Sequence, residues 1–339
     1  MVKSTMQNLR ARVQKSGKTF YYFDAGGKPR KELPLGSDYV LAVRKWSELM
    51  ALQADAIPVS NFEELAKRYE TEVLPLKATS TQATQRSDLK LLRKFFEQAP
   101  LDEIKPKHIQ KLLEWKKAQP TTANRIKRLF SHMFNKARSW GYTEAANPVT
   151  GIEGFALGKR EVYVTDAVFK AVWAVAAAPL RDAMDLAYLT GQRPGDVLGF
   201  NERQIEDGVF VIKKQSKTGK PLRIRVEGQF GALIERITQR KAGYKIWCTS
   251  LAVNTRGLPL SKQVLRDNFA VAKKAAIAAN PKLASDIKEF WFYDLRAKAA
   301  DDVSDDRGDQ AAADLLGHDN VSTTQRHYLR RGKKVGPTK

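Results

Sequence analysis

The spacing of apolar residues changes along the chain and divides it into three parts. Residues 8–35 alternate short β-type runs with turns that contain Gly17 and Gly26, and residues 40–52 have apolar positions at helical spacing. Glycine-containing turns between such runs are typical of hairpins. The pattern predicts a three-stranded sheet with one helix over residues 1–57.

A helical pattern follows and continues to about residue 147. Apolar residues recur at helical spacing in four segments: 61–74, 84–97, from after Pro106 to about Lys117, and from Thr121 or Thr122 to about Trp140. They predict a four-helix domain over residues 58–147. Residues 148–162 begin with a turn-rich stretch and are predicted to be a linker.

Residues 163–339 are predicted to be mostly helical with one β excursion. Residues 208–213 and 222–226 have the pattern of paired strands around the turn 215–220. The expected fold class is therefore mainly α and multidomain. It comprises a small β-sheet-plus-helix module, a four-helix domain, and a mostly helical third domain with a small antiparallel β-sheet.

The charge of the chain indicates a polyanionic partner. Fifty-nine Lys and Arg residues against 37 Asp and Glu give a formal net charge of +22. Nucleic acid is favoured over an anionic membrane surface. A basic β-ribbon can enter a major groove and a basic helical face can contact phosphates, although either can also be a solvated surface. The candidate DNA contacts are Arg10, Arg12, Lys18, Arg30 and Lys31 in the first module and Arg125, Lys127 and Arg128 on the last helix of the second.

Several other site classes are not expected. The chain has one cysteine, Cys248, in an apolar setting that predicts a buried structural thiol, and too few histidines for a zinc site with closely spaced ligands. The acidic segment 301–309 lacks the closing glutamate of a calcium loop and is predicted to be a solvated helix start or loop. We expect no metal and no cofactor. Without an apolar leader or spanning segment, a cytoplasmic protein is expected.

Four short motifs occur in order in the last 150 or so residues. They are residues 190–198 (TGQRPGDVL), 216–218 (SKT), 293–296 (YDLR) and 316–318 (LGH), and the last is followed by Tyr328. A tyrosine with its usual pKa of about 10 is a weak nucleophile at neutral pH, so it needs nearby positive charge. Fixed guanidinium groups that face a phosphate also stabilise the charge that grows on its oxygens during attack.

The ordered motifs resemble those of the tyrosine recombinase family, the integrases of phages and mobile elements. The resemblance implies a core-binding role for the helical domain and an arm-binding role for the first module. It also implies that Arg193 and Arg296 clamp the scissile phosphate, that Lys217 protonates the departing 5′ oxygen and that His318 donates a hydrogen bond to the phosphate. Tyr328 would attack phosphorus to form a 3′-phosphotyrosine bond.

Two departures from the family pattern bear on this assignment. The second motif usually begins with histidine, but Tyr293 stands there, and a phenol is a poor proton shuttle at neutral pH. The nucleophile usually follows the Gly-His motif by nine positions, whereas Tyr328 lies ten beyond His318 and His327 occupies the ninth. Asp196 is expected to support the site structurally. Lys213, Lys214 and Lys220 compete with Lys217 for the role of general acid.

The leading hypothesis is a metal- and ATP-independent site-specific recombinase that integrates, and in some cases excises, a phage or other mobile element. Its expected partners are double-stranded DNA with core-type and arm-type sites, three further copies in a tetramer, and DNA-bending or excision proteins of a bacterial host. The alternatives are an inactive DNA-binding relative, a recombinase that resolves plasmid or chromosome dimers, and a type IB topoisomerase. The basic tail 330–334 could bind phosphates or pack on a neighbouring subunit.

Overall fold

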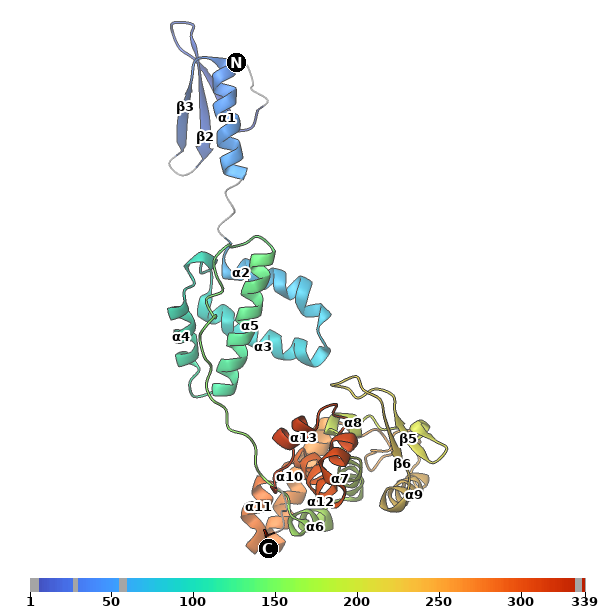
Figure 1. The fold of residues 1–339 in the computed structure, drawn as a ribbon. Coiled ribbons are helices and arrows are strands. Elements are labelled where there is room, and N and C mark those ends of the chain that lie inside the picture. Colours follow the sequence, from blue (N-terminus) through green and yellow to red (C-terminus); the bar gives the residue numbers. More distant parts are fainter. Residues whose placement is uncertain (1–5, 27–29, 55–59, 333–336, 339) are drawn as a thin grey trace. The chain divides into compact units, whose positions relative to one another are not determined.

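The computed structural model describes residues 6–26, 30–54, 60–332 and 337–338. The chain divides into two units, residues 1–158 and 159–339, and the first contains both the β-sheet module and the helical domain. The boundary expected at residue 57 lies outside the described residues. Figure 1 shows the elements, which are taken here one part at a time.

The N-terminal module is an antiparallel sheet of order β1-β2-β3 covered by one helix (Figure 1). Leu9, Phe23, Leu35 and Ala42 form its small buried core. The β1–β2 turn contains Gly17, whose φ of 78° suits a residue without a Cβ. The elements are β1 (Leu9–Val13), β2 (Thr19–Gly26), β3 (Lys31–Gly36) and α1 (Tyr39–Ala54).

The helical domain is built around stacked aromatic rings. Phe96 lies 5.2 Å from Phe62 and 4.7 Å from Phe130 between ring centroids, and all three side chains are buried. The long helices are α2 (Phe62–Arg68), α3 (Thr79–Phe96), α4 (Pro106–Trp115) and α5 (Pro120–Ser139). Short π and 3₁₀ turns at Tyr69–Val73, Leu74–Leu76 and Leu101–Glu103 join them.

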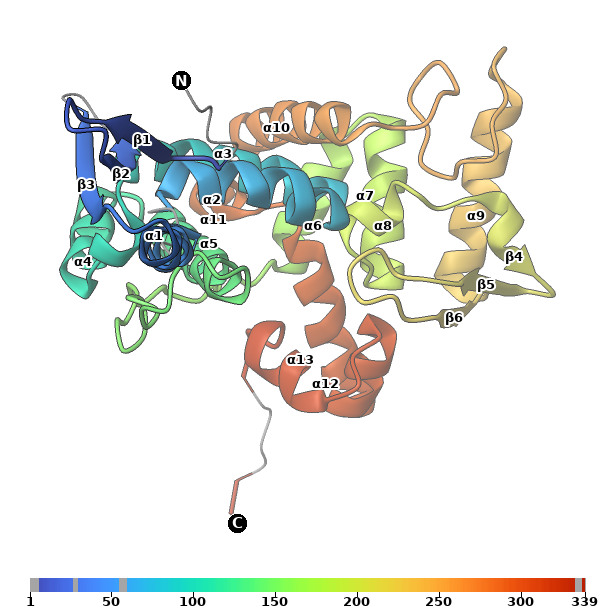
Figure 2. The ribbon, with the colours of Figure 1, turned by 90° about the horizontal axis from the view of Figure 1, so that it is seen from above.

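The second unit packs helices around a separate core, with its three-stranded sheet β4-β5-β6 at one side. Figure 2 shows α9 beside β5 and β6, where Phe230 meets Phe210 edge to face. The helices are α6 (Asp166–Val175), α7 (Ala178–Thr190), α8 (Pro194–Val197), α9 (Gly228–Ala242), α10 (Lys262–Ala279), α11 (Ala284–Glu289), α12 (Asp294–Leu316) and α13 (Val321–His327). The strands are β4 (Ile205–Glu206), β5 (Val209–Ile212) and β6 (Leu222–Arg225), and 3₁₀ turns lie at Glu202–Gln204 and Pro281–Leu283.

The expected fold class is confirmed, but two local expectations are wrong. The acidic segment 301–309 lies inside α12. Asp301 is only 3% exposed and accepts main-chain N–H groups of the tail, Asp302 and Asp305 pair with Arg331, and residues 305–308 are exposed. Cys248 is half-buried instead of buried, and its thiol contacts the carbonyl oxygen of Gly257 at 3.1 Å. Within the described residues, we find no helix with the length and apolar character needed to cross a bilayer.

The buried aromatic stack predicts which side chains of the first unit cannot be shortened without a large loss of stability. Phe130→Ala should lower the free energy of unfolding by about 3–5 kcal/mol, because it removes a fully buried ring from a close-packed core. Leu76→Ala, at a side chain that is 83% exposed, is the matched control and should have little effect. The measurement is the urea transition of the full chain, followed by helical circular dichroism. Equal effects of the two substitutions would contradict the proposed role of the stack.

Candidate active site

The first arginine motif begins where α7 ends. Gly191 caps this helix in the left-handed conformation with φ 63°, and a Cβ there would lie only 3.1 Å from the Leu316 side chain. The turn directs Gln192 and Arg193 toward the start of α8. A glycine is therefore needed at 191 both for the backbone conformation and for close packing against the last turn of α12.

Arg296 is the most enclosed charged group of the site. It lies in the first turn of α12 and is 1% exposed. Its Nη1 donates to the carbonyl oxygen of Gly191 at 2.7 Å, and its Nη2 donates to that of Leu316 at 3.0 Å. Burial lowers the pKa of Arg296 below its usual range. This guanidinium thus joins three of the sequence motifs in one place.

His318 contacts Arg296 through one ring nitrogen and α13 through the other. Its Nε2 lies 3.1 Å from Nη2 of Arg296, and its Nδ1 lies 2.8 Å from Oγ1 of Thr324. An arginine can only donate, so Nε2 accepts and the proton is on Nδ1. Burial, with Arg296 and Arg193 nearby, lowers the pKa of His318 to about 4. Donation to a phosphate would therefore require the other neutral tautomer, with the Thr324 hydroxyl as donor to Nδ1.

Tyr328 caps α13, and its side chain is buried against these groups. Its ring centroid lies 5.1 Å from Cζ of Arg296 and 5.1 Å from the ring centroid of His318. Its hydroxyl is 3.0 Å from that of Tyr293. The structure thus brings the expected nucleophile into contact with the second arginine motif and the Gly-His motif.

The two tyrosines have opposite pKa shifts. Burial and the hydrogen bond to Tyr328 raise the pKa of Tyr293 to about 12. Burial alone would raise the pKa of Tyr328 too, but the Tyr293 hydrogen bond and the charges of Arg296 and Arg193 lower it below its usual value. Either hydroxyl can donate in this hydrogen bond, and the opposite shifts favour the arrangement in which Tyr293 donates and Tyr328 accepts.

Arg193 and Asp196 are the two charged residues that the first arginine motif contributes to the site. Nη1 of Arg193 lies 4.0 Å from Oδ2 of Asp196, and Oδ1 of Asp196 accepts the main-chain N–H of Ser216 at 2.8 Å. Within the described part of the chain, Nη1 of Arg193 and Nε of Arg296 are buried without a hydrogen-bond partner. Buried donors without acceptors are costly, so an anionic acceptor at these two groups would stabilise both.

The lysine hairpin is joined to the site through buried amides. Nε2 of Gln215 donates to Oε1 of Gln192 at 2.6 Å and to the carbonyl oxygen of Leu316 at 3.2 Å. Lys217 lies two residues beyond Gln215 with an exposed side chain. Lys220 pairs with Asp319 beside His318, whereas Lys213 and Lys214 are exposed. The hairpin root is thus fixed at the site, while the side chain of Lys217 does not contact the other groups.

The candidate DNA contacts are partly engaged in internal interactions. Arg10 and Arg30 pair with Asp24, and Arg12 pairs with Glu32. Lys18 lies over the Phe20 ring, and Lys31 is exposed. In the helical domain, Arg125 makes a two-point ion pair with the buried Asp88, Lys127 binds the carbonyl oxygen of Ile152 at 2.6 Å and Arg128 contacts that of Asn124 at 3.3 Å. These pairs orient the cations and leave parts of several side chains exposed.

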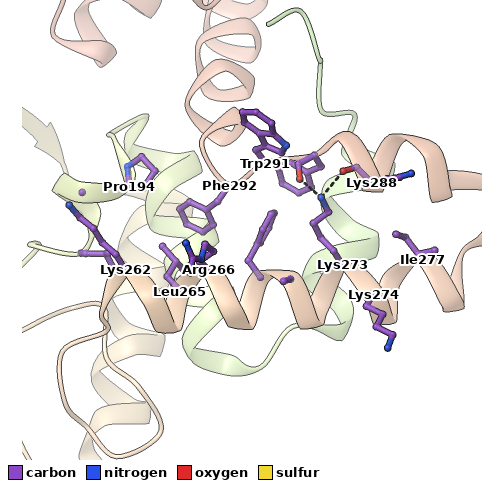
Figure 3. A pocket seen from close by; sticks show the side chains of 15 residues that line it. Pro194, Lys262, Leu265, Arg266, Lys273, Lys274, Ile277, Lys288, Trp291 and Phe292 are labelled. Atoms are coloured by element: carbon purple, nitrogen blue, oxygen red, sulfur yellow. Dashed lines mark hydrogen bonds between the residues drawn. The ribbon is translucent and has the colours of Figure 1, made fainter. Parts of the chain in front are cut away.

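A cavity of about 670 Å³ lies on another side of α8 and is not part of this cluster. Figure 3 shows Leu265 and Phe292 among its apolar lining, with Lys262 at the rim. Lys273 donates to the main-chain oxygens of Lys288 and Phe290, both at 2.7 Å. The candidate catalytic side chains do not line it. Within the described residues, His, Cys, Asp and Glu nowhere gather in a group of three that could hold a metal.

Sequence reasoning missed several residues that surround the site. Gln192 and Gln215 are neutral amides, which no catalytic pattern in the sequence singles out. Their hydrogen bond to each other is visible only in the structure, where both side chains are buried. Asp294 lies within the second motif and Arg330 within the tail, but the ion pair between them joins positions that no periodicity relates. Arg330 and Arg331 both bind carboxylates of this same unit, and Lys333 and Lys334 of the expected tail lie outside the described residues.

Comparisons with known proteins match the sequence to a family and the fold to solved structures. The family model described as the phage integrase family matches residues 165–334, half of the chain. The integrase of Escherichia phage HK022 is 29% identical over 259 residues, which cover 73% of this chain and 70% of that protein. A crystal structure of a lambda integrase dimer bound to a core site has a TM-score of 0.71 and 21% identity, covering 99% of both chains. A lambda integrase tetramer bound to a Holliday junction also has a TM-score of 0.71 and 21% identity, covering 98% of this chain and 97% of that one.

The depressed pKa of His318 predicts a dependence of stability on pH. The unfolded chain binds a proton on this residue near its reference pKa of about 6.5, whereas the folded chain binds it only near pH 4. The free energy of unfolding should therefore fall as the pH is lowered from about 6.5 to about 4. His318→Gln should remove this component. Histidine NMR titration of the full chain measures the midpoint directly, and a midpoint near 6.5 would contradict the assigned environment.

Proposed function

This chain belongs to the phage integrase family, and on that premise we propose that it recombines DNA at specific sites by means of Tyr328. One observation carries the proposal. Tyr328 lies in a buried cluster with Arg296, His318 and Tyr293, and two N–H groups of the site, Nη1 of Arg193 and Nε of Arg296, have no acceptor among the described residues. A scissile phosphate would supply the acceptors that these donors lack.

The proposed reaction is a reversible transfer of a phosphoryl group between oxygens. The Tyr328 oxygen attacks phosphorus, the bond to the 5′ oxygen breaks, and a 3′-phosphotyrosine bond forms. Arg193 and Arg296 neutralise the charge on the phosphoryl oxygens, which is larger at five-coordinate phosphorus than in the ground state. The 5′ hydroxyl of another strand then attacks the phosphotyrosine and restores a DNA backbone.

Lys217 is proposed as the acid that protonates the departing 5′ oxygen. Its side chain is exposed on a hairpin whose root is fixed to the site by Gln215 and Asp196. A lysine on a flexible stem at that place can reach a phosphate held by the two arginines. Lys220 is a weaker candidate because Asp319 already pairs with it.

Tyr293 is proposed to activate the nucleophile by hydrogen bonding and not to carry protons. Its pKa of about 12 makes it a persistent donor at neutral pH. The hydrogen bond to Tyr328 stabilises the ionised form of that phenol. An aromatic donor at the position where the family usually has histidine is thus compatible with cleavage, which weighs against the inactive DNA-binding alternative.

Double-stranded DNA is the proposed partner of both units. The lambda integrase structures contain a dimer on a core site and a tetramer on a Holliday junction, and we propose the same tetrameric assembly here. The proposed phosphate contacts are the basic side chains of the N-terminal module and of α5. A separate N-terminal module favours an integrase over a dimer-resolving recombinase. DNA-bending and excision proteins are proposed as accessory partners, and the phage relatives suggest a bacterial cytoplasm as the place of action.

The function is tested by trapping the covalent intermediate. Wild-type protein incubated with a nicked duplex that carries the repeat flanking its gene should form a protein–DNA adduct visible on a denaturing gel. The adduct should form in EDTA and without ATP, because guanidinium and ammonium groups supply the positive charge that metals supply in nucleases. Tyr328→Phe should form none. No adduct with wild type, or an equal yield from Tyr328→Phe, would overturn the proposal.

A supercoiled plasmid without the repeat separates the recombinase from a type IB topoisomerase. We expect wild type to leave this plasmid supercoiled and to act only on plasmids that carry the site. Relaxation of both plasmids at equal rates would favour the topoisomerase.

The donor role proposed for Tyr293 predicts how the cleavage rate changes when its hydroxyl is removed. Tyr293→Phe retains the ring but removes the donor, so the pKa of Tyr328 should rise and cleavage at neutral pH should slow by about 10-fold. The rate should recover at higher pH, where more Tyr328 is ionised. Single-turnover cleavage rates measured across pH check this. A profile identical in shape to that of wild type would contradict a donor role.

A further inference from the structure

Four of the carboxylates of α12 contact the linker and the tail. Asp294, Asp301 and Asp305 recur at intervals of seven and four residues, Asp302 lies beside Asp301, and we call these four residues the acidic face. They precede Gly308, where the helix is interrupted by a φ of 87°. The acidic face binds two segments from opposite ends of the second unit: the linker residues 160–163 and the tail residues 330–331.

Asp294 connects both segments. It is fully buried, and its Oδ1 accepts from Nε of Arg160 at 2.8 Å and from Nη1 of Arg330 at 2.7 Å. Arg330 is also hydrogen-bonded to the carbonyl oxygen of Val162, and its side chain is only 5% exposed. A buried charge needs its partners, because the loss of one leaves the other desolvated without compensation. Linker, tail and α12 therefore hold each other in place.

Asp301 holds the backbone of the tail. Its Oδ1 accepts the main-chain N–H groups of Arg330 at 2.9 Å and Arg331 at 3.3 Å. The Arg331 side chain continues along the acidic face, 2.9 Å from Asp305 and 3.6 Å from Asp302. Both the main chain and the side chains of the tail are thus attached to α12.

These contacts lie next to the proposed nucleophile. Tyr328 is two residues before Arg330, a separation that spans at most about 7 Å of extended chain. On its other side, the main-chain N–H of Tyr328 donates to the carbonyl oxygen of Thr324 at 2.8 Å, and Thr324 is bonded to His318. The nucleophile is therefore held between two anchors, one at the Gly-His motif and one at the acidic face.

We propose that Asp294 and Asp301, acting through Arg330, are positioning residues that keep the Tyr328 hydroxyl against Tyr293 and Arg296, and that Arg160 ties the interdomain linker to the same anchor. This inference rests on the proposed function, since it assigns the placement of that nucleophile. Arg330 itself is too enclosed to serve as a phosphate contact. Linker and tail are connected both through the carboxylate of Asp294 and through the hydrogen bond from Arg330 to the carbonyl oxygen of Val162.

The test compares Arg330→Gln with the matched control Arg307→Gln. Arg307 lies on α12 with its side chain 63% exposed and lies 3.6 Å from the carboxylate of Asp306. Arg330→Gln should slow single-turnover cleavage of the nicked duplex by roughly 100-fold, because small displacements of a reacting group are costly, with unchanged affinity for that duplex. Arg330→Lys should recover part of the rate. Asp294→Asn should also slow cleavage, with Asp306→Asn as its exposed control.

A second readout does not require cleavage. In full-length protein with ¹³Cζ-labelled tyrosine, the Tyr328 resonance is assigned by its absence in Tyr328→Phe, and its titration midpoint is measured. Arg330→Gln should raise this midpoint, because the phenol moves away from Tyr293 and Arg296. A general loss of stability would lower the unfolding temperature without moving the midpoint of the molecules that remain folded.

The outcomes separate this inference from the proposed function. If wild type forms an adduct and Arg330→Gln matches Arg307→Gln in both rate and midpoint, the positioning role is wrong and the recombinase assignment stands. If wild type forms no adduct but the Tyr328 midpoint responds to Arg330→Gln alone, the anchor is real and the proposed function fails. If Arg330→Gln does not fold, Arg330→Lys and Asp294→Asn decide by the same two measurements.

Discussion

The hydrogen bonds of the buried Arg296 guanidinium organise the second unit. A charge with 1% exposure is tolerated only where acceptors surround it, and here they are main-chain oxygens at the end of α7 and in the last turn of α12. Carbonyl oxygens at the ends of helices have no partner within the helix and carry partial negative charge. Arg296 thus satisfies two helix ends and draws residues 191, 296 and 316–318 together. The same contacts leave its Nε buried without a hydrogen-bond partner in the described part of the chain.

The chemistry proposed for Tyr328 follows from this arrangement. A phenol enclosed in protein becomes harder to ionise, and a phenol beside fixed positive charge becomes easier to ionise. At Tyr328 the second effect prevails, because Arg296, Arg193 and the Tyr293 hydroxyl all favour the ionised oxygen. At Tyr293 burial prevails. The pKa values of two tyrosines in contact are therefore shifted in opposite directions, which favours Tyr293 as the donor and Tyr328 as the acceptor.

Several carboxylates of this strongly basic chain form ion pairs with its arginines. Asp24 holds Arg10 and Arg30, Asp88 holds Arg125, and Asp294 holds Arg160 and Arg330. Each of these three acids is at least nine-tenths buried. Arg10, Arg30 and Arg125 remain partly exposed, whereas the side chain of Arg330 is only 5% exposed, so the pair between Asp294 and Arg330 is the one most removed from water. The net charge of +22 favours attraction to DNA at long range. The buried acids determine which arginines are held in a defined orientation by ion pairs.

The sequence by itself determined the element types and the candidate chemistry. Hydrophobic spacing follows from the geometry of one helix or strand, so it predicted the sheet module, the four helices and the β excursion of the second unit. The ordered motifs named Tyr293, Arg296 and His318, which meet at Tyr328, whereas Lys217 of the same set is exposed outside this cluster. Only the tertiary structure decided that the acidic segment 301–309 is a packed helix, that Gln192 pairs with Gln215, and that Asp294 pairs with Arg330. Such pairs join positions 23 and 36 residues apart. Composition and the spacing of apolar residues carry no information about which distant charges and amides are buried together, because burial depends on how the whole core is assembled.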